Sequence, residues 1–209
     1  NKKYKDLGKY SNEFMLAKPY PHLVLDNFLN ENFFLSLDIE NFNKDPKRGK
    51  TFNTNIEKNK WISKNNELSN NLKQIIDTLN SSEFVDNLQN LSKIKELFST
   101  TEGNTALANY HEMYESGFLG THVDHSSEPN TGLPHVLNII LYLSKNWKNE
   151  WGGETILANP KGTKIGKKIN FIPNRAVIFL HSPFTFHGVT EIKNNTIKRS
   201  TIYVDYYSK

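Results

Sequence analysis

The sequence predicts a mainly β protein, a jelly-roll-like double sheet with helices packed on one side. Residues 105–209 contain about eight short strand-like runs separated by turn residues, whereas residues 1–104 carry mostly helical patterns. Phe, Tyr and Trp make up 12% of the chain, so aromatic side chains are expected to supply much of the buried area. Because 209 residues suit one hydrophobic core, we expect a single domain, with residues 1–104 as helical flank and first strands and residues 105–209 as the β core.

The first half is expected to contain one strand, three helices and a polar segment. Asn30 can cap the first helix, to which Phe33, Phe34, Leu37 and Ile39 contribute apolar contacts. Apolar residues recur at three- and four-residue steps in the second helix, which is typical of an amphipathic helix. In order, the expected elements are a strand over 22–28, a helix over 30–42, a loop or loose hairpin over 45–61, and helices over 66–80 and 83–98.

The second half is expected to consist of strands. Turns are placed at Gly117, Gly152–Gly153, Asn159–Pro160 and Pro173–Asn174, because these residue types favour chain reversal. The expected strands cover 106–114, 119–125, 135–144, 153–158, 169–172, 175–181, 185–191 and 199–207.

The composition excludes several classes of protein and site. The chain has no cysteine, so disulfides, thiolate metal sites and cysteine nucleophiles are absent, and His, Asp and Glu remain as metal ligands. The net charge of +4 comes from scattered lysines without the basic and aromatic pattern of nucleic-acid binding, so no nucleic-acid partner is expected. No apolar run is long enough to span a membrane and residues 1–20 lack a signal peptide's apolar core, which favours a soluble, cytoplasmic protein.

Three residues form a candidate metal site. His122 and Asp124 lie two apart in an expected strand, so their side chains project from the same face. Alone, this pair is better interpreted as a surface pair making ordinary hydrogen bonds. His187 lies in a later strand, and two histidines with one carboxylate on one face of an ion leave the opposite positions open, as Fe(II) enzymes with a chelating cosubstrate require.

Arg199 is the fourth candidate catalytic residue. It begins the final apolar strand, twelve positions after His187. A guanidinium at the mouth of a β-barrel can make a two-pronged contact with a carboxylate, so Arg199 would anchor the far end of a dicarboxylic cosubstrate. Alone, it could equally be an ordinary surface arginine at a strand start.

Residues 110–207 resemble the prolyl-4-hydroxylase-like branch of the 2-oxoglutarate and Fe(II)-dependent oxygenases. Six ordered blocks carry the resemblance, and together they cover nearly half of the chain. They are Tyr114-Glu-Ser-Gly117, His122-Val-Asp124, Leu137-Asn-Ile-Ile-Leu-Tyr-Leu143, Gly152-Gly-Glu-Thr155, Pro173-Asn-Arg-Ala-Val-Ile-Phe179, and His187 with Arg199.

The resemblance implies a double-stranded β-helix, with Fe(II) bound by His122, Asp124 and His187. It also implies 2-oxoglutarate and O₂ as cosubstrates, oxidative decarboxylation to succinate and carbon dioxide, and ascorbate as a supporting reductant. Tyr114 and Asn138 are implied to line the cosubstrate pocket with Arg199. The chain departs from several relatives in having Arg199 in place of Lys and Asn138 in place of Thr.

The resemblance makes hydroxylation of prolyl residues in a peptide or protein the first hypothesis for the reaction. Alternatives are hydroxylation of a free amino acid, sugar or natural product, or a non-catalytic jelly-roll module that binds a metal or sugar. Asp124 occupies the position that a halide would need, which disfavours a halogenase. The polar segment 45–61 is as compatible with a lid over the site as with a mobile surface loop. The sequence leaves the oligomeric state open.

Other histidines and aromatic residues near these motifs are assigned ordinary structural roles. His111, His125, His135 and His181 are expected to be hydrogen-bonded or solvent-facing, because none shares the strand face and spacing of the candidate ligands. Tyr142, Phe179, Phe184 and Phe186 are expected in the core.

Overall fold

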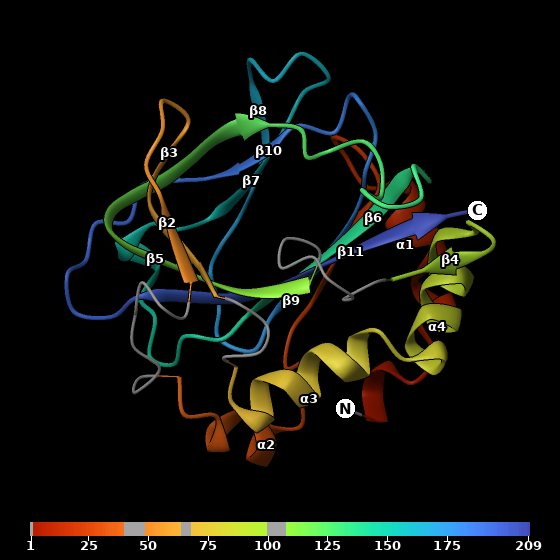
Figure 1. The fold of residues 1–209 in the computed structure, drawn as a ribbon, viewed down its shortest axis with the longest axis horizontal. Helices are drawn as coiled ribbons and strands as arrows, with labels where there is room; N and C mark the ends of the chain where they lie inside the picture. The colour runs from red at the N-terminus through yellow and green to blue at the C-terminus, as the bar shows by residue number, and fades with distance from the viewer. Residues whose placement is uncertain (1, 40–48, 64–67, 100–107) are drawn as a thin grey trace.

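The computed structural model describes residues 2–39, 49–63, 68–99 and 108–209. Its eleven strands form one curled antiparallel sheet, with the helices on the outside of one half (Figure 1). The main path runs β1-β9-β6-β11-β5-β10-β7-β8, while β3 pairs with β5 and β2, and β4 pairs with β11. The predicted fold class, a β jelly roll with N-terminal helices, is confirmed.

The helices begin and end at residues that cap them. The elements are 3-10 helices at Lys2–Tyr4 and Leu7–Tyr10, α1 (Ser11–Leu16), α2 (Glu31–Ser36), α3 (Asn70–Leu79), α4 (Ser82–Ser92) and a 3-10 turn at Asn149–Trp151. The side chain of Asn30 accepts a hydrogen bond from the Phe33 amide, as predicted, and Ser69 and Ser81 cap α3 and α4 in the same way.

All three predicted helices are shorter in the structure, and α3 covers Asn70–Leu79 of the predicted 66–80. Helix α2 ends at Ser36, and residues 40–42 of the predicted helix lie outside the described residues. The predicted helix over 83–98 is wrong at its end, because α4 stops at Ser92 and Leu97–Phe98 form β4. The cap residue Lys93 adopts a left-handed backbone with φ of 62°, which ends the helical hydrogen-bonding pattern.

The strands of the first half are β1 (His22–Leu25), β2 (Gly49–Phe52) and β3 (Glu57–Ser63). Strands β2 and β3 form a hairpin within the segment predicted as a loop or loose hairpin, and β3 continues the sheet by pairing with β5. Residues 45–48 of that segment lie outside the described residues.

The strands of the second half are β5 (Ala108–His122), β6 (His135–Tyr142), β7 (Thr155–Ala158), β8 (Ile165–Ile169), β9 (Ala176–Leu180), β10 (His187–Val189) and β11 (Arg199–Ser208). The predicted break at Gly117 is wrong, because β5 continues through it. The strand accommodates the turn residues as an irregularity, with Ser116 at φ 58° and a register shift against β3. The predicted strand over 169–172 is largely wrong, because β8 covers Ile165–Ile169 and shares only Ile169 with it.

Two hydrophobic clusters lie on opposite faces of the sheet. Ile139 and Leu141 of β6 pack in the cluster that contains the helices, whereas Ile140 and Tyr142 pack in the cluster inside the curl. Strand β11 alternates in the same way, with Ile202 and Val204 in the helix-side cluster. The inside of the curl therefore receives the remaining residues of β11, starting with Arg199. No helix in the described part of the chain is long and apolar enough to cross a membrane.

Candidate active site

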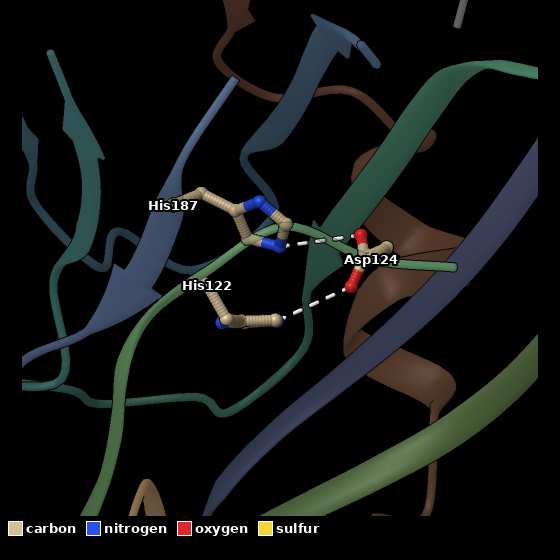
Figure 2. A group of neighbouring side chains, drawn as sticks. All are labelled: His122, Asp124 and His187. Atoms are coloured by element: carbon tan, nitrogen blue, oxygen red, sulfur yellow. Dashed lines mark hydrogen bonds and ion pairs between the residues drawn. The ribbon is translucent and has the colours of Figure 1, made fainter. Parts of the chain in front are cut away.

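His122, Asp124 and His187 lie together inside the curl. His122 is the last residue of β5 and His187 the first residue of β10, and the two stand opposite each other in the antiparallel pairing. The Asp124 carboxylate bridges them, with its Oδ1 3.2 Å from Nε2 of His122 and its Oδ2 3.3 Å from Nε2 of His187. Figure 2 shows the three side chains pointing toward one another. The structure therefore brings together the three predicted ligands.

The remaining ring nitrogens of both histidines face backbone carbonyls. Nδ1 of His122 lies 2.9 Å from the Gly120 oxygen, and Nδ1 of His187 lies 3.5 Å from the Thr185 oxygen. An imidazole that donates its Nδ1–H in this way presents the lone pair of Nε2 to the carboxylate. Two lone pairs facing a carboxylate suit a cation between them, and two imidazole nitrogens with one carboxylate oxygen are a donor set that Fe(II) accepts. The three residues thus fit the ion that the sequence implied.

The local electrostatics at His187 and Asp124 favour the protonation states that a metal requires. At His122 burial acts to lower the pKa, but the hydrogen bond to Asp124 outweighs it and raises that pKa. Burial lowers the pKa of His187 to about 4, which keeps its imidazole neutral. Burial acts to raise the pKa of Asp124, but the neighbouring His187 and His122 outweigh it and hold that pKa well below its ordinary value. A neutral imidazole and an ionised carboxylate are the forms that bind metal ions.

Two neutral donors orient the Asp124 carboxylate. Its Oδ2 accepts hydrogen bonds from Nδ2 of Asn138 at 2.8 Å and from the hydroxyl of Tyr203 at 2.9 Å. Asn138 was expected to line the cosubstrate pocket, but its amide donates to Asp124 and also lies 3.1 Å from the Tyr203 hydroxyl. Tyr203 was not singled out from the sequence. It could have been found by counting in steps of two along the final strand from Arg199.

Arg199 lies on the inner face of β11 and is buried, with 3% of its surface exposed. Its Nε donates to the Gly153 carbonyl at 2.8 Å and its Nη2 to the Thr155 hydroxyl at 3.3 Å. Its guanidinium carbon lies 5.3 Å from the ring centre of Tyr142 and 5.0 Å from that of Phe171. Among the described residues no carboxylate pairs with it, and burial lowers its pKa to about 10.

One cavity of about 190 Å³ connects Arg199 with the His122–Asp124–His187 cluster. Tyr203 lines it together with His111 and Met113 of β5, and Lys60 and Ile62 of β3 reach it from the hairpin. A cation-binding cluster and a buried guanidinium thus face the same small space. This arrangement can hold the two ends of a short dicarboxylic acid.

Tyr114 is not brought to this cavity. Its hydroxyl donates to Glu112, whose carboxylate also pairs with Lys198 at 2.6 Å, and the ring borders a different cavity of about 310 Å³ on the other face of β5. The reason is a register shift beside His122. Leu119 of β5 pairs with Val189 of β10, and His122 pairs with His187, so β5 contains one more residue than β10 between these two pairs. The extra residue reverses which side chains face inward, and Met113 takes the inner position.

Tyr142 and Thr155 border Arg199 and were missed as site residues. Tyr142 was expected in the core, which is confirmed, but its hydroxyl also donates to Thr155 at 2.6 Å beside the guanidinium. The alternation that puts Ile140 inside the curl also puts Tyr142 there, so the sequence did contain a signal for it.

Comparison with protein families matches residues 106–205 to the 2OG-Fe(II) oxygenase superfamily. The β core of this chain belongs to that superfamily. The matched residues include the three candidate metal ligands, His122, Asp124 and His187, and also Arg199. No curated protein sequence matches the chain.

Solved structures share the fold of this oxygenase at low sequence identity. A Pseudomonas putida prolyl-4-hydroxylase superposes with a TM-score of 0.70 at 13% identity, covering 97% of this chain and 99% of that one. A Trichoplax adhaerens prolyl hydroxylase in complex with a hypoxia inducible factor peptide fragment gives 0.63 at 17% identity, covering 99% and 91%. A viral collagen prolyl hydroxylase from Paramecium Bursaria Chlorella virus-1 gives 0.58 at 11% identity, covering 93% and 99%.

Three of the other histidines of the oxygenase make the hydrogen bonds expected of them, and His111 is the exception in part. His111 is half-buried and stacks on Tyr203 with ring centres 5.6 Å apart, and its buried Nε2 has no hydrogen bond among the described residues. His181 agrees with the expectation, since its Nδ1 lies 2.9 Å from the His135 carbonyl. His125 and His135 gather around Asp205 on the inner face of β11. Phe179 is buried as expected, whereas Phe184 is wrongly placed in the core, because 63% of its surface is exposed.

Proposed function

We propose that this oxygenase holds Fe(II) with His122, Asp124 and His187 and binds the distal carboxylate of 2-oxoglutarate with Arg199. The observation that carries the proposal is the buried guanidinium of Arg199, which opens into the same cavity as the ligand cluster. A buried cation is costly unless an anion pairs with it, and among the described residues no carboxylate does so. A dicarboxylate cosubstrate supplies that anion.

The residues around Arg199 orient this contact. Gly153 and Thr155 accept hydrogen bonds from Nε and Nη2, so they fix the plane of the guanidinium and leave its other N–H groups for a carboxylate. The hydroxyl of Tyr142 donates to Thr155 and so helps to hold the Thr155 hydroxyl beside the guanidinium. Tyr142 and Phe171 exclude water from the contact, which strengthens it.

The residues around Asp124 orient the metal end. Asn138 and Tyr203 both donate to Oδ2, so Oδ1 is the oxygen left for the ion. Bound there, Fe(II) supplies the activation of O₂ that couples decarboxylation of 2-oxoglutarate to oxidation of a C–H bond. Ascorbate would keep the iron in its ferrous state.

The substrate that we propose is a prolyl residue of a peptide or protein. The support is the fold shared with three prolyl hydroxylases, one of them in complex with a peptide fragment. The β2–β3 hairpin borders the cavity through Lys60 and Ile62, so the described part of the segment 45–61, residues 49–61, is the proposed lid over the substrate. A small free substrate would need less of this border than a peptide does.

The test is oxidation of a panel of proline-rich peptides, free proline and sugar nucleotides, with Fe(II), ascorbate and 2-oxoglutarate. We expect succinate release and a mass gain of one oxygen atom on a prolyl residue of a peptide. H122A and D124A should show no turnover because each loses a metal ligand.

Two outcomes would contradict the proposal. A mass gain only on free proline or a sugar nucleotide would overturn the peptide substrate but leave the chemistry. Absence of succinate in the anaerobically loaded, oxygen-started enzyme would overturn the enzymatic function and favour a non-catalytic binding module.

A further inference from the structure

A second cluster of metal-ligating side chains lies beside the active site. It consists of His125, His135 and Asp205, which we call the second cluster. Nε2 of His125 lies 3.6 Å from Oδ2 of Asp205, and Nε2 of His135 lies 3.1 Å from Oδ1 of the same carboxylate. It therefore repeats the arrangement at Asp124, with one carboxylate facing two imidazole Nε2 atoms, and it shares no residue with that cluster.

Two buried polar atoms at the centre of the second cluster face each other and have no further partner. The side chains of His135 and Asp205 are completely buried, and Nε2 of His135 lies 3.1 Å from Oδ1 of Asp205, while neither atom has another hydrogen-bond partner among the described residues. Nδ1 of His135 lies 3.0 Å from the His125 carbonyl, so that contact takes the ring proton and leaves the Nε2 lone pair toward the carboxylate. Buried polar groups with so few partners are costly, and a cation between the imidazole and the carboxylate would satisfy both.

The second cluster is held rigidly and is accessible from one side. The His135 ring stacks on His181 with centres 4.0 Å apart and an angle of 10°, which fixes the direction of Nε2. His125 has 37% of its side chain exposed, and both His125 and Asp205 border the active-site cavity. An ion can therefore reach the buried carboxylate past His125.

We propose that the second cluster binds one Zn²⁺ ion through Nε2 of His125, Nε2 of His135 and the carboxylate of Asp205. Two imidazoles and one carboxylate match zinc, whereas Ca²⁺ and Mg²⁺ require mostly oxygen ligands. The three donor atoms lie within 4.8 Å of one another, which is the spread that a shared ion needs. The Tyr207 hydroxyl, 2.8 Å from Nε2 of His125, competes with the ion for that lone pair and is not a ligand.

The ion would fix the segment that carries Asp124. His125 directly follows Asp124, whereas His135 begins β6 and Asp205 lies in β11. Zinc at the second cluster therefore ties the end of the metal-binding segment to two central strands. The ion would have three protein ligands, and its binding is independent of the proposed reaction.

The experiment measures zinc binding in a background without the first site. The double variant H122A/H187A is dialysed against Zn²⁺, and metal analysis gives the number of ions per chain. We expect one ion. Adding His125→Gln should weaken binding by more than about a hundredfold, because it removes a ligand whose exposure makes misfolding a minor concern.

Two further variants separate ligands from neighbours. Asp205→Asn in the same background should also lose the ion, with circular dichroism reporting whether the buried substitution still folds. Tyr207→Phe is the matched control, and it should retain zinc because it removes only the competing hydroxyl.

No zinc in the H122A/H187A background, or undiminished zinc after His125→Gln, would overturn the proposal and leave a metal-free His–Asp pair. Because this background lacks the iron ligands, failure of the oxygenase proposal would not change the zinc result.

Discussion

Replacing Arg199 with Met tests whether this arginine exists for a cosubstrate. The substitution R199M keeps an unbranched side chain of similar reach and removes the cation. A guanidinium buried against a carboxylate contributes about 3–5 kcal/mol when one partner is removed. At about 1.4 kcal/mol per tenfold, the dissociation constant for 2-oxoglutarate should rise by roughly a hundredfold to a few thousandfold.

The same substitution should change the stability of the ligand-free protein much less. Burial lowers the pKa of Arg199 from its ordinary value to about 10, which corresponds to a cost of about 3 kcal/mol for keeping the charged form folded. R199M removes that cost but leaves the Gly153 carbonyl without its hydrogen bond from Nε, at about 1–3 kcal/mol, whereas the Thr155 hydroxyl keeps its hydrogen bond from Tyr142. The two effects oppose each other, so the free energy of unfolding should change by no more than about 2–3 kcal/mol.

The assay is calorimetric titration of 2-oxoglutarate into anaerobic Fe(II)-loaded protein, together with denaturant unfolding of the ligand-free protein. R175M is the matched control, because the Arg175 guanidinium is already paired with Asp26 at 2.6 Å. It should bind 2-oxoglutarate as tightly as the unmodified chain does. If R199M binds 2-oxoglutarate within threefold of the unmodified chain, Arg199 is not the anchor and the reasoning from its missing counter-ion fails.

Two other substitutions test the metal end and the periphery. Tyr203→Phe removes one of the two hydrogen bonds that neutral groups donate to Oδ2 of Asp124, so Fe(II) affinity should fall about tenfold. The affinity for 2-oxoglutarate at saturating metal should stay unchanged. If only the folding stability falls, Tyr203 contributes to packing and not to metal binding. Asp26→Asn breaks a partly exposed ion pair with Arg175 and should cost at most about 1 kcal/mol at pH 7. Arg175 holds the pKa of Asp26 below 3.8, so the pair stabilises the fold above that pH and the difference between variant and parent should vanish as the pH falls through the lowered pKa. Denaturant unfolding at several pH values checks this, and a difference that persists in acid would assign the effect to something other than charge.

Local patterns predicted the parts of the fold that depend on neighbouring residues. Asn30 caps α2 as expected, and the strand face shared by His122 and Asp124 brought both side chains to one site. The end of α4 could not be predicted, because Lys93 adopts a left-handed conformation with φ of 62°. Lysine does not favour this conformation, so the tertiary structure imposes it and the local sequence gives no signal for it.

The positions of Tyr114 and Asn138 differ from the expectation for another reason. Tyr114 is an even number of positions before His122, so a regular strand would point both inward, but β5 is irregular at Ser116 and contains an extra residue between Leu119 and His122. A register shift depends on pairing with a distant strand and leaves no local signal. Asn138 does face inward, but its donation to Asp124 depends on how β6 and the end of β5 meet in space.

The pairing of His122 with His187 across β5 and β10 has a consequence for how the protein assembles. The two residues are far apart in the sequence, so their imidazoles meet only after the curl has closed. Ferrous iron would then stabilise the pairing of two strands that had already formed without it. Iron binding should therefore slow amide hydrogen exchange in β10 more than in the helices on the far side of the sheet.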